Sequence, residues 1–400
     1  MKKMKSLSLL IIAALLIPLL SGCWNRRELN ELAFVVGLSI DKSGDQYLIS
    51  AQVVDPGEVS TSARGGGRAP VTTYDEKGNH IFEAVRRITT ISPRKLYWSH
   101  LQMLVISEAV AKDGINNILD FFTRDNEFRK DFYIVVSKGT QAKEILRNLT
   151  SIEKIPAHKM RSSLETSEKA WAPTVAIQLD ELISSLTSEG IHPVLTGISI
   201  RGKAAKGESV DNVQRIDPFA RLKYKNIAIF KKDKLIGWFN EKESKGYNYI
   251  RDNVKSTVGH VPCPKKGQLI IEIIRSKSKI KGRVVKGKPK IDIQVTAEAN
   301  IGEVACHIDL TKPETIKKLE ENTEKVNMDI LKASIDKAKK FGVDIFGFGE
   351  VIHRADPQAW KKFKKNWDRE FVNIPVTIHS DFKIRQTGAV NQSFLEQEKE

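Results

Sequence analysis

The order of hydrophobic and polar residues predicts alternating strands and helices in the first half of the chain. An apolar run from Ala33 to Ile40, a polar turn at 42–45 and a second run from Tyr47 to Val54 form the pattern of a β-hairpin. Strand-like runs and segments with helical spacing then alternate. The predicted helices are 80–88, 108–125 with a break at 113–114, and 175–188, and the predicted strands are 100–107, 131–139 and 192–200. This alternation predicts a domain with a mixed sheet and packed helices.

The second half contains longer strands with a period of two. Apolar residues of one parity recur through 291–301 and through 374–384, which is typical of strands with one buried face in an antiparallel sheet. Between them, Thr311 and Glu314 have capping-box spacing at the start of a helix that ends at Gly342. This helix has Pro313 in its first turn and an apolar stripe of Ile316, Leu319, Val326 and Ile330.

A further helix, beginning at Asp356-Pro357, combines aromatic residues with lysines. Trp360, Phe363, Trp367 and Phe371 share one face, and Lys361, Lys362, Lys364 and Lys365 lie opposite. Amphipathic basic helices can lie on bilayers. Because long alternating strands need a helix over their apolar face, we expect the aromatic residues to pack on the adjacent sheet and the lysines to be solvated.

Polar segments suggest the limits of the domains. Residues 55–70 and 201–218 lack a hydrophobic period, a hairpin is predicted at 225–244, and the Gly-x-Gly of 344–350 predicts a tight turn. We therefore predict an α+β fold with mixed and antiparallel sheets and packed helices in two to three domains. The predicted division is a signal peptide at 1–22, an N-terminal domain at 23–200, a linker at 201–218, a C-terminal region at 219–388, taken as one unit or as subdomains 219–265 and 266–388, and a polar tail at 389–400.

The first 23 residues have the layout of a bacterial lipoprotein signal. Lys2, Lys3 and Lys5 precede an apolar run of 12 residues at 9–20, which is shorter than the roughly 20 residues of a transmembrane helix. The following Leu20-Ser21-Gly22-Cys23 resembles a lipobox. We therefore expect cleavage before Cys23, which would carry an S-diacylglycerol and an N-acyl group. Two or more acyl chains give stable anchoring, whereas one alone is marginal.

The net charge indicates acidic partners. Removing the signal takes away Lys2, Lys3 and Lys5 and no acidic residue, so the formal charge falls from +16 to +13. Outside the cell, anionic lipid headgroups or an acidic partner are the natural counter-charges. We expect no nucleic-acid binding, because export removes the target and the sequence contains no RNP, zinc-finger or helix-turn-helix signature.

Little in the sequence points to catalysis or to a bound metal or cofactor. With Cys23 acylated, Cys263 and Cys306 remain, either as a disulfide or as buried free thiols. The eight histidines form no HxH or HExxH group. The adjacent carboxylates of Asp180 and Glu181 are the candidates for an acid-base pair, but neighbouring residues point to different sides of a helix or strand. We predict a protein without enzymatic activity, cofactor or metal.

Several stretches together resemble the Ger(x)C family, the C-subunit lipoproteins of spore germinant receptors. They span nearly the whole chain after the signal and stand in the family's order. They are CWNRRELNELAFVVGLSIDK from Cys23, SPRKLYWSHLQMLVISEAVAKDGI from Ser92, FTRDNEFRKDFYIVVSKGTQAKEIL from Phe122, PVLTGISI from Pro193, IAIFKKDKLIGWFNEKESKG from Ile227 and VDIFGFGEVIHRADPQAWKKF from Val343. Asn25 stands where the family usually has an acidic residue.

The resemblance implies a mixed α/β protein of three domains on the outer face of the spore inner membrane. It implies two polytopic partners, the A and B subunits, in a complex that senses nutrients and triggers germination. It also implies that the protein is not an enzyme, and Cys23 is the one functional residue that it carries over. Whether this subunit contacts the germinant does not follow from it.

Two other functions compete with this one. A solute-binding lipoprotein of an envelope transporter also begins with a lipobox, but it needs two α/β lobes joined by crossing linkers around a cleft. The long strands with a period of two favour antiparallel sheets instead. An anchored hydrolase of envelope polymer would depend on a pair such as Asp180 and Glu181.

Overall fold

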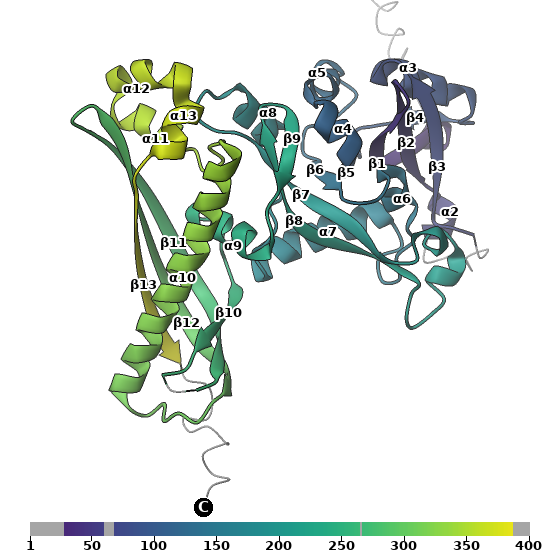
Figure 1. Ribbon diagram of the computed structural model, residues 1–400. Helices are drawn as coiled ribbons and strands as arrows, with labels where there is room; N and C mark the ends of the chain where they lie inside the picture. Colours follow the sequence, from purple (N-terminus) through teal and green to yellow (C-terminus); the bar gives the residue numbers. More distant parts are fainter. Residues whose placement is uncertain (1–27, 60–67, 265, 387–400) are drawn as a thin grey trace, which may run out of the picture.

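Two β-sheets organise the part of the chain that the computed structural model describes, residues 28–59, 68–264 and 266–386 (Figure 1). The first sheet has nine strands in the order β3-β2-β1-β5-β6-β7-β8-β9, with β4 paired to β1. The strands are β1 (Leu32–Ser43), β2 (Gln46–Val54), β3 (Val71–Gly78), β4 (Lys95–Tyr97), β5 (Met103–Ser107), β6 (Tyr133–Ser137), β7 (Val194–Gly202), β8 (Ala220–Lys231) and β9 (Lys234–Trp238). The predicted hairpin at the start of the chain, now β1 and β2, is confirmed.

The first sheet is mixed, as predicted. Its central strands β1, β5, β6 and β7 run parallel, whereas β2 and β3 on one side and β8 and β9 on the other are antiparallel to their neighbours. Every residue of β5 is buried, because helices cover both faces of a parallel region. The predicted linker 201–218 connects β7 to β8, which pair with each other, so the sheet continues across it.

This sheet and the helices packed on it form the first unit of the molecule. The helices form a layer on each face of the sheet. One apolar core lies beneath α3 (Ile81–Arg87), α4 (Glu108–Asp113), α5 (Asn116–Arg124) and α8 (Leu179–Thr187). The core on the opposite face is closed by α6 (Ala142–Arg147) and α7 (Pro156–Ala170). The predicted helices are confirmed as α3, α4, α5 and α8, and the short helix α2 (Pro56–Val59) lies within the segment predicted as a loop.

The second sheet has four strands in the order β10-β11-β12-β13. They are β10 (Thr257–Pro262), β11 (Gln268–Val285), β12 (Lys288–Ala305) and β13 (Val376–Gln386). The predicted parity is confirmed, since Ile291, Ile293 and Val295 are buried on one face of β12. The expected antiparallel arrangement is wrong for the last pair, because α10 (Pro313–Phe341) returns the chain to the end where β12 began, and β13 then runs parallel to β12.

The long helix α10 confirms the predicted helix, with corrections at its start and on its buried face. Its N-cap is Lys312, and the Thr311 hydroxyl donates to Asp309 Oδ1 at 2.6 Å, so the predicted capping box does not form. Gly342 ends the helix in the left-handed region, as predicted. The buried stripe differs from the expected one, because it includes polar residues and because Ile316, Val326 and Ile330 are only partly buried. Its members are Leu319, Thr323, Asn327, Leu331, Ser334, Ile335 and Ala338.

A helical cap, formed by α11 (Phe348–Ala355), α12 (Pro357–Phe363), η5 (Lys364–Asn366) and α13 (Trp367–Asn373), closes one end of the second sheet (Figure 1). The predicted start at Asp356-Pro357 is confirmed, with the Asp356 side chain as N-cap. Trp360 and Trp367 are buried with their rings 5.1 Å apart, while Lys361 and Lys362 are exposed. The aromatic face is therefore buried as predicted, but its neighbours include α11, and η5 divides the expected single helix.

A disulfide joins Cys263, just after β10, to Cys306, just after β12. Both residues are buried at the same end of the second sheet. Of the two alternatives open from the sequence, the structure therefore contains the bridge.

Candidate functional site

The four-stranded sheet, α10 and the helical cap form the second unit of the molecule. The two units meet where the loop between α8 and β7 lies against the cap. Gly190 packs directly on the backbone of α11, since a Cβ at this position would lie 2.6 Å from the Glu350 amide nitrogen. Next to this contact, the Ser188 hydroxyl donates to Glu350 Oε1 at 2.9 Å, and the His192 amide donates to the Asp344 carbonyl at 2.6 Å. Glycine is required here because two backbones touch.

His192 is the central polar residue of this junction. Its Nδ1 accepts a hydrogen bond from the Lys232 amide at 3.1 Å, so the ring proton lies on Nε2, which is 3.1 Å from Asp368 Oδ1. Lys231 reaches the other oxygen of Asp368 at 3.0 Å. The hydrogen bond from His192 is the main cause that lowers the pKa of Asp368 to about 2, and Lys231 adds to it. These contacts join the α8–β7 loop, the end of β8 with the following turn, and α13.

Asp344 organises the loop that precedes α11. It is fully buried, and its two oxygens accept from the amides of Phe346, Gly347 and Gly349 and from Trp367 Nε1, at 2.8–3.0 Å. Burial raises the pKa of this carboxyl to about 6, although the hydrogen bonds from Gly349, Trp367 and Phe346 act in the opposite direction. Gly347 supplies the left-handed backbone that the loop needs, with φ at +77°. The tight turn predicted at 344–350 is confirmed for 344–347, whereas 348–350 form the beginning of α11.

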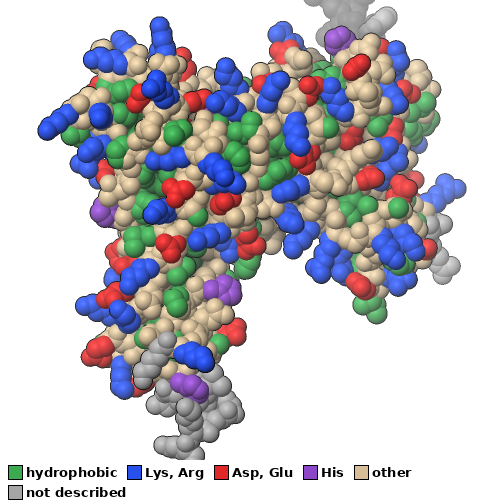
Figure 2. Space-filling model, in the orientation of Figure 1, with side chains coloured by type: hydrophobic (Ala, Val, Ile, Leu, Met, Phe, Trp, Pro, Cys, Tyr) green, Lys and Arg blue, Asp and Glu red, His purple; other side chains and the backbone are tan. Residues whose placement is uncertain are grey.

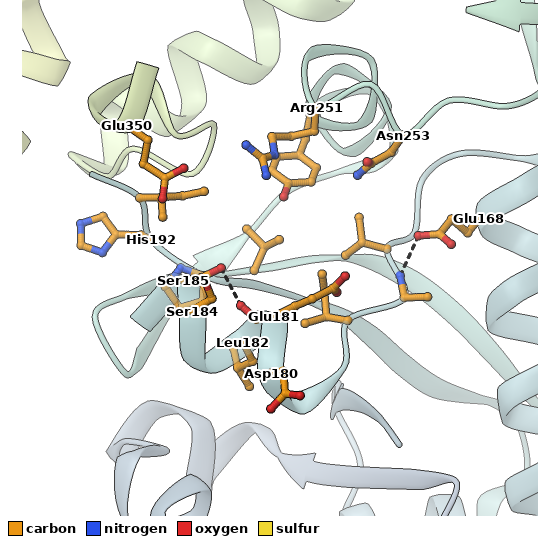
Figure 3. A pocket seen from close by; sticks show the side chains of 17 residues that line it. Glu168, Asp180, Glu181, Leu182, Ser184, Ser185, His192, Arg251, Asn253 and Glu350 are labelled. Atoms are coloured by element: carbon orange, nitrogen blue, oxygen red, sulfur yellow. Dashed lines mark hydrogen bonds between the residues drawn. The ribbon is translucent and has the colours of Figure 1, made fainter. Parts of the chain in front are cut away.

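A cavity of about 500 Å³ lies between α8, the start of β7, the end of α9 (Glu241–Ile250) and α11 (Figure 3). Its wall carries more acidic than basic side chains. The acidic residues are Glu168, Asp180, Glu181 and Glu350, and Arg251 is the guanidinium among the lining residues. Arg251 Nη1 is held by the Phe346 carbonyl at 2.9 Å, and Glu168 accepts from the Ala176 amide at 2.9 Å, with burial raising its pKa.

Ser185 and His192, which line this cavity, are both engaged in hydrogen bonds within the protein. The Ser185 hydroxyl donates to the Glu181 carbonyl within its own helix, and both ring nitrogens of His192 are already engaged. A nucleophile activated by a histidine therefore does not occur among the described lining residues. Asp180 and Glu181 both lie in the first turn of α8, and Figure 3 shows their side chains on different sides of the helix.

Metal sites, membrane-spanning helices and the predicted lipid attachment site are the other features expected from or excluded by the sequence. Between residues 28 and 386, leaving aside 60–67 and 265, no group of three or more His, Cys, Asp or Glu side chains is placed to hold a metal ion. Within the same ranges, no helix combines the length and the apolar character needed to span a bilayer. Cys23, the predicted site of lipid attachment, lies outside the described residues.

Sequence reasoning did not identify the residues that build the junction. His192, Arg251 and Glu350 come from three separate elements, and their spacing along the chain contains no motif. A signal did exist at Asp344, because an aspartate followed by two glycines in DIFGFGE is a pattern in which a carboxylate can cap backbone amides. That segment was predicted only as a turn.

Comparison with known proteins covers both halves of the chain. The model for "Spore germination protein N-terminal domain" matches residues 25–200, and the model for "Spore germination B3/ GerAC like, C-terminal" matches 225–388. Spore germination protein KC of Bacillus subtilis is 31% identical, over 98% of both chains. Spore germination protein B3 of the same species is 25% identical, over 97% of this chain and all of that protein.

A solved structure shows the same fold. The crystal structure of the GerBC protein matches with a TM-score of 0.56 and 21% sequence identity, over 90% of this chain and 99% of that chain. The mixed α+β architecture predicted from the sequence is thereby confirmed. With matches to both family models and a relative of 31% identity along nearly the full length, the chain belongs to the Ger(x)C family of spore germination proteins.

Proposed function

We propose that this chain is a lipid-anchored, non-enzymatic subunit of a nutrient germinant receptor, needed for assembly of the receptor and for its signal. The observation that carries this proposal is the match to spore germination protein KC over 98% of both chains, because it includes both units and the junction between them. The side chains at the inter-unit cavity support a binding role over catalysis, since His192 and Ser185 are engaged elsewhere.

Anchoring through Cys23 is the second part of the proposal. Cys23 is five residues before Glu28, where the described chain begins, and this connection spans at most about 18 Å when fully extended. The 3₁₀ turn η1 (Leu29–Glu31) and β1 follow at once. Acyl chains on Cys23 would therefore hold the first unit close to the outer face of the inner membrane, where two polytopic partner subunits would reside.

The domain division at 201–218 remains part of the proposal. The ranges of the two family models, 25–200 and 225–388, support it. The sheets are divided at a different place, because β8 and β9 complete the first sheet and the second begins with β10. A subdomain at 219–265 would therefore contain strands from both sheets.

A solute-binding lipoprotein fits the structure less well. That function needs two similar α/β lobes with several linkers crossing between them. In the described chain, strands 32–238 build the first sheet and strands 257–386 the second, so the strand-bearing units are connected once, through α9. The second unit is a four-stranded sheet under one long helix, which differs from the first.

The proposal is tested by complementing a deletion of the gene in a spore-forming host. The wild-type chain should restore germination with at least one nutrient, and Cys23→Ala should restore it poorly and incorporate no labelled palmitate. Unchanged germination of the deletion strain with every nutrient, or loss of uptake of one solute, would contradict the receptor role. A Cys23→Ala protein that still takes up label and sediments with membranes would contradict the anchor.

A further inference from the structure

Three surface segments share the side of the molecule on which the described chain begins. In Figure 1 this side is at the top, with α3 at the right end and α12 and the turn between β11 and β12 at the left end. The lower parts of α10 and β13 point away from it. The first sheet separates this side from the opposite one, because α3, α4, α5 and α8 pack on one face and α6 and α7 on the other. We call the side on which the described chain begins the tether side, because the proposed anchor at Cys23 precedes it.

The segment nearest the tether exposes apolar and basic side chains together. Because β4 runs parallel to β1 with Lys95 opposite Leu32, the preceding Arg94 lies beside the start of the described chain. Ile91 belongs to the same connection, directly after the 3₁₀ turn η2 (Ile88–Thr90). Ile91 is 48% exposed and Phe82, on α3, is 49% exposed. The Arg86 guanidinium lies 4.9 Å from the centre of the Phe82 ring.

Two of the acidic residues near this segment have ion-pair partners, whereas Glu28 and Glu31 have none among the described residues. Glu83 pairs with Arg87 at 2.7 Å, and Glu127 pairs with Lys95 at 2.7 Å. Among the described residues, Arg86 and Arg94 form no ion pair, so their charges remain available. Exposed apolar residues beside free cations form a surface that suits the headgroup region of an anionic bilayer.

The far end of the same side is strongly basic. Residues 281–290 contain five Lys or Arg and no acidic residue, and residues 357–366 contain four Lys and no acidic residue. By contrast, α10 carries seven basic and six acidic residues along its length. Figure 2 shows the blue side chains of Lys and Arg gathered at the upper left, where α12 and the β11–β12 turn lie in Figure 1.

We propose that this side, the tether-side face, lies directly on an anionic membrane surface. It is defined by Phe82, Ile91 and Arg94 near the tether and by Lys286, Lys361 and Lys362 at the far end. The proposal rests on the proposed acylation of Cys23, because a connection of at most about 18 Å keeps this side next to the bilayer. Two separated contacts would fix the orientation of the protein, which a lipid anchor alone leaves free.

The test places an environment-sensitive dye on single introduced cysteines of the full-length, acylated protein in vesicles that contain phosphatidylglycerol. Ile91→Cys reports on the tether end, and Val285→Cys, in a strand next to Lys286, reports on the far end. Ile152→Cys is the control, because Ile152 is fully exposed between α6 and α7, on the other face of the sheet. The first two probes should shift to blue emission, and the control should stay water-like.

A pair of charge variants tests the basic end. Lys361→Gln with Lys362→Gln should reduce the shift at Val285, whereas Lys317→Gln with Lys318→Gln, a matched lysine pair at the start of α10, should leave it unchanged. If the protein sediments with the vesicles but neither probe shifts, the tether-side face is wrong and the anchor stands. If the acylated protein does not sediment, both proposals fail. A shift that requires the polytopic subunits would assign the face to a protein partner and overturn the proposal.

Discussion

At the scale of single residues, Asp344 has the largest structural role among the side chains of the junction. One carboxylate satisfies three backbone amides and the indole of Trp367, and it thereby shapes the loop on which Gly190 and His192 rest. A buried carboxylate with four donors is costly to replace, because each donor left without a partner carries its desolvation penalty.

Asp344→Asn should therefore lower the free energy of unfolding by about 2–4 kcal/mol at pH 7. An asparagine presents an NH₂ group to one pair of donors, which then face another donor. Chemical denaturation of the purified protein measures the effect, with Asp336→Asn on the exposed side of α10 as the control. Equal stability of Asp344→Asn and wild type at pH 7 would show that the loop does not depend on this carboxylate.

The same residue predicts how stability depends on pH. The pKa of Asp344 is raised from the ordinary 3.8 to about 6 in the folded protein, mainly by burial, so the proton binds the folded state more tightly. The additional stability that comes from this proton uptake is complete below about pH 4 and is lost as the pH rises through 6, while the hydrogen bonds to the carboxylate remain. As the pH is lowered from 7 to 5, the free energy of unfolding of wild type should rise relative to that of Asp344→Asn. Parallel profiles of the two proteins would contradict a raised pKa at Asp344.

At the scale of elements, the contact between the α8–β7 loop and α11 depends on glycine at two facing positions. A Cβ at Gly190 would lie 2.6 Å from the Glu350 amide nitrogen, and one at Gly349 would lie 2.7 Å from the Gly190 Cα. Neither backbone can yield easily, because hydrogen bonds from Ser188 and His192 hold the loop on the cap.

Gly190→Ala should push the two units apart and lower the free energy of unfolding by about 1–3 kcal/mol. Gly302→Ala in β12 is the matched control, since its added Cβ would meet only the Ile270 carbonyl, at an ordinary 3.7 Å. Thermal unfolding and limited proteolysis of the junction loop report the change. If both alanine variants behave alike, the close backbone contact does not hold the units together.

Local signals identified some elements correctly, whereas other elements with such signals were missed. The parity of 291–301 and the glycine after α10 identified a strand and a helix end correctly. The helices α6 and α7 were missed, although Gln141 and Glu144 have capping-box spacing at the start of α6 and Pro156 lies in the first turn of α7. Partners far along the chain also complete these first turns. The Asp41 carboxylate accepts from the Ala142 and Lys143 amides at 2.8 Å, and Gln52 Oε1 accepts from the Ala157 amide at 3.1 Å.

The candidate site shows the same limit. Asp344 precedes two glycines and could be suspected from its neighbours, but His192, Arg251 and Asp368 meet only after both units have folded. The wrong capping box has a related cause, since Asp309 takes the Thr311 hydroxyl and leaves Lys312 at the N-cap. Local spacing does not reveal which of two nearby acceptors a side chain will use.

At the scale of the whole molecule, the proposed tether would hold the first unit on the membrane, and α10 of the second unit extends away from that side (Figure 1). The junction residues set the angle between the units, and the tether-side face would set the angle to the bilayer. The cavity beside His192 lies between the units, so a polar solute or a partner side chain bound there would contact both.

Purification from spore membranes tests whether this chain is a receptor subunit. A tagged full-length chain, extracted from inner membranes in mild detergent, should retain two polytopic subunits in comparable amounts, and Cys23→Ala should retain less of both. Recovery of the chain alone, or together with the permease of a solute transporter, would contradict the role as a receptor subunit.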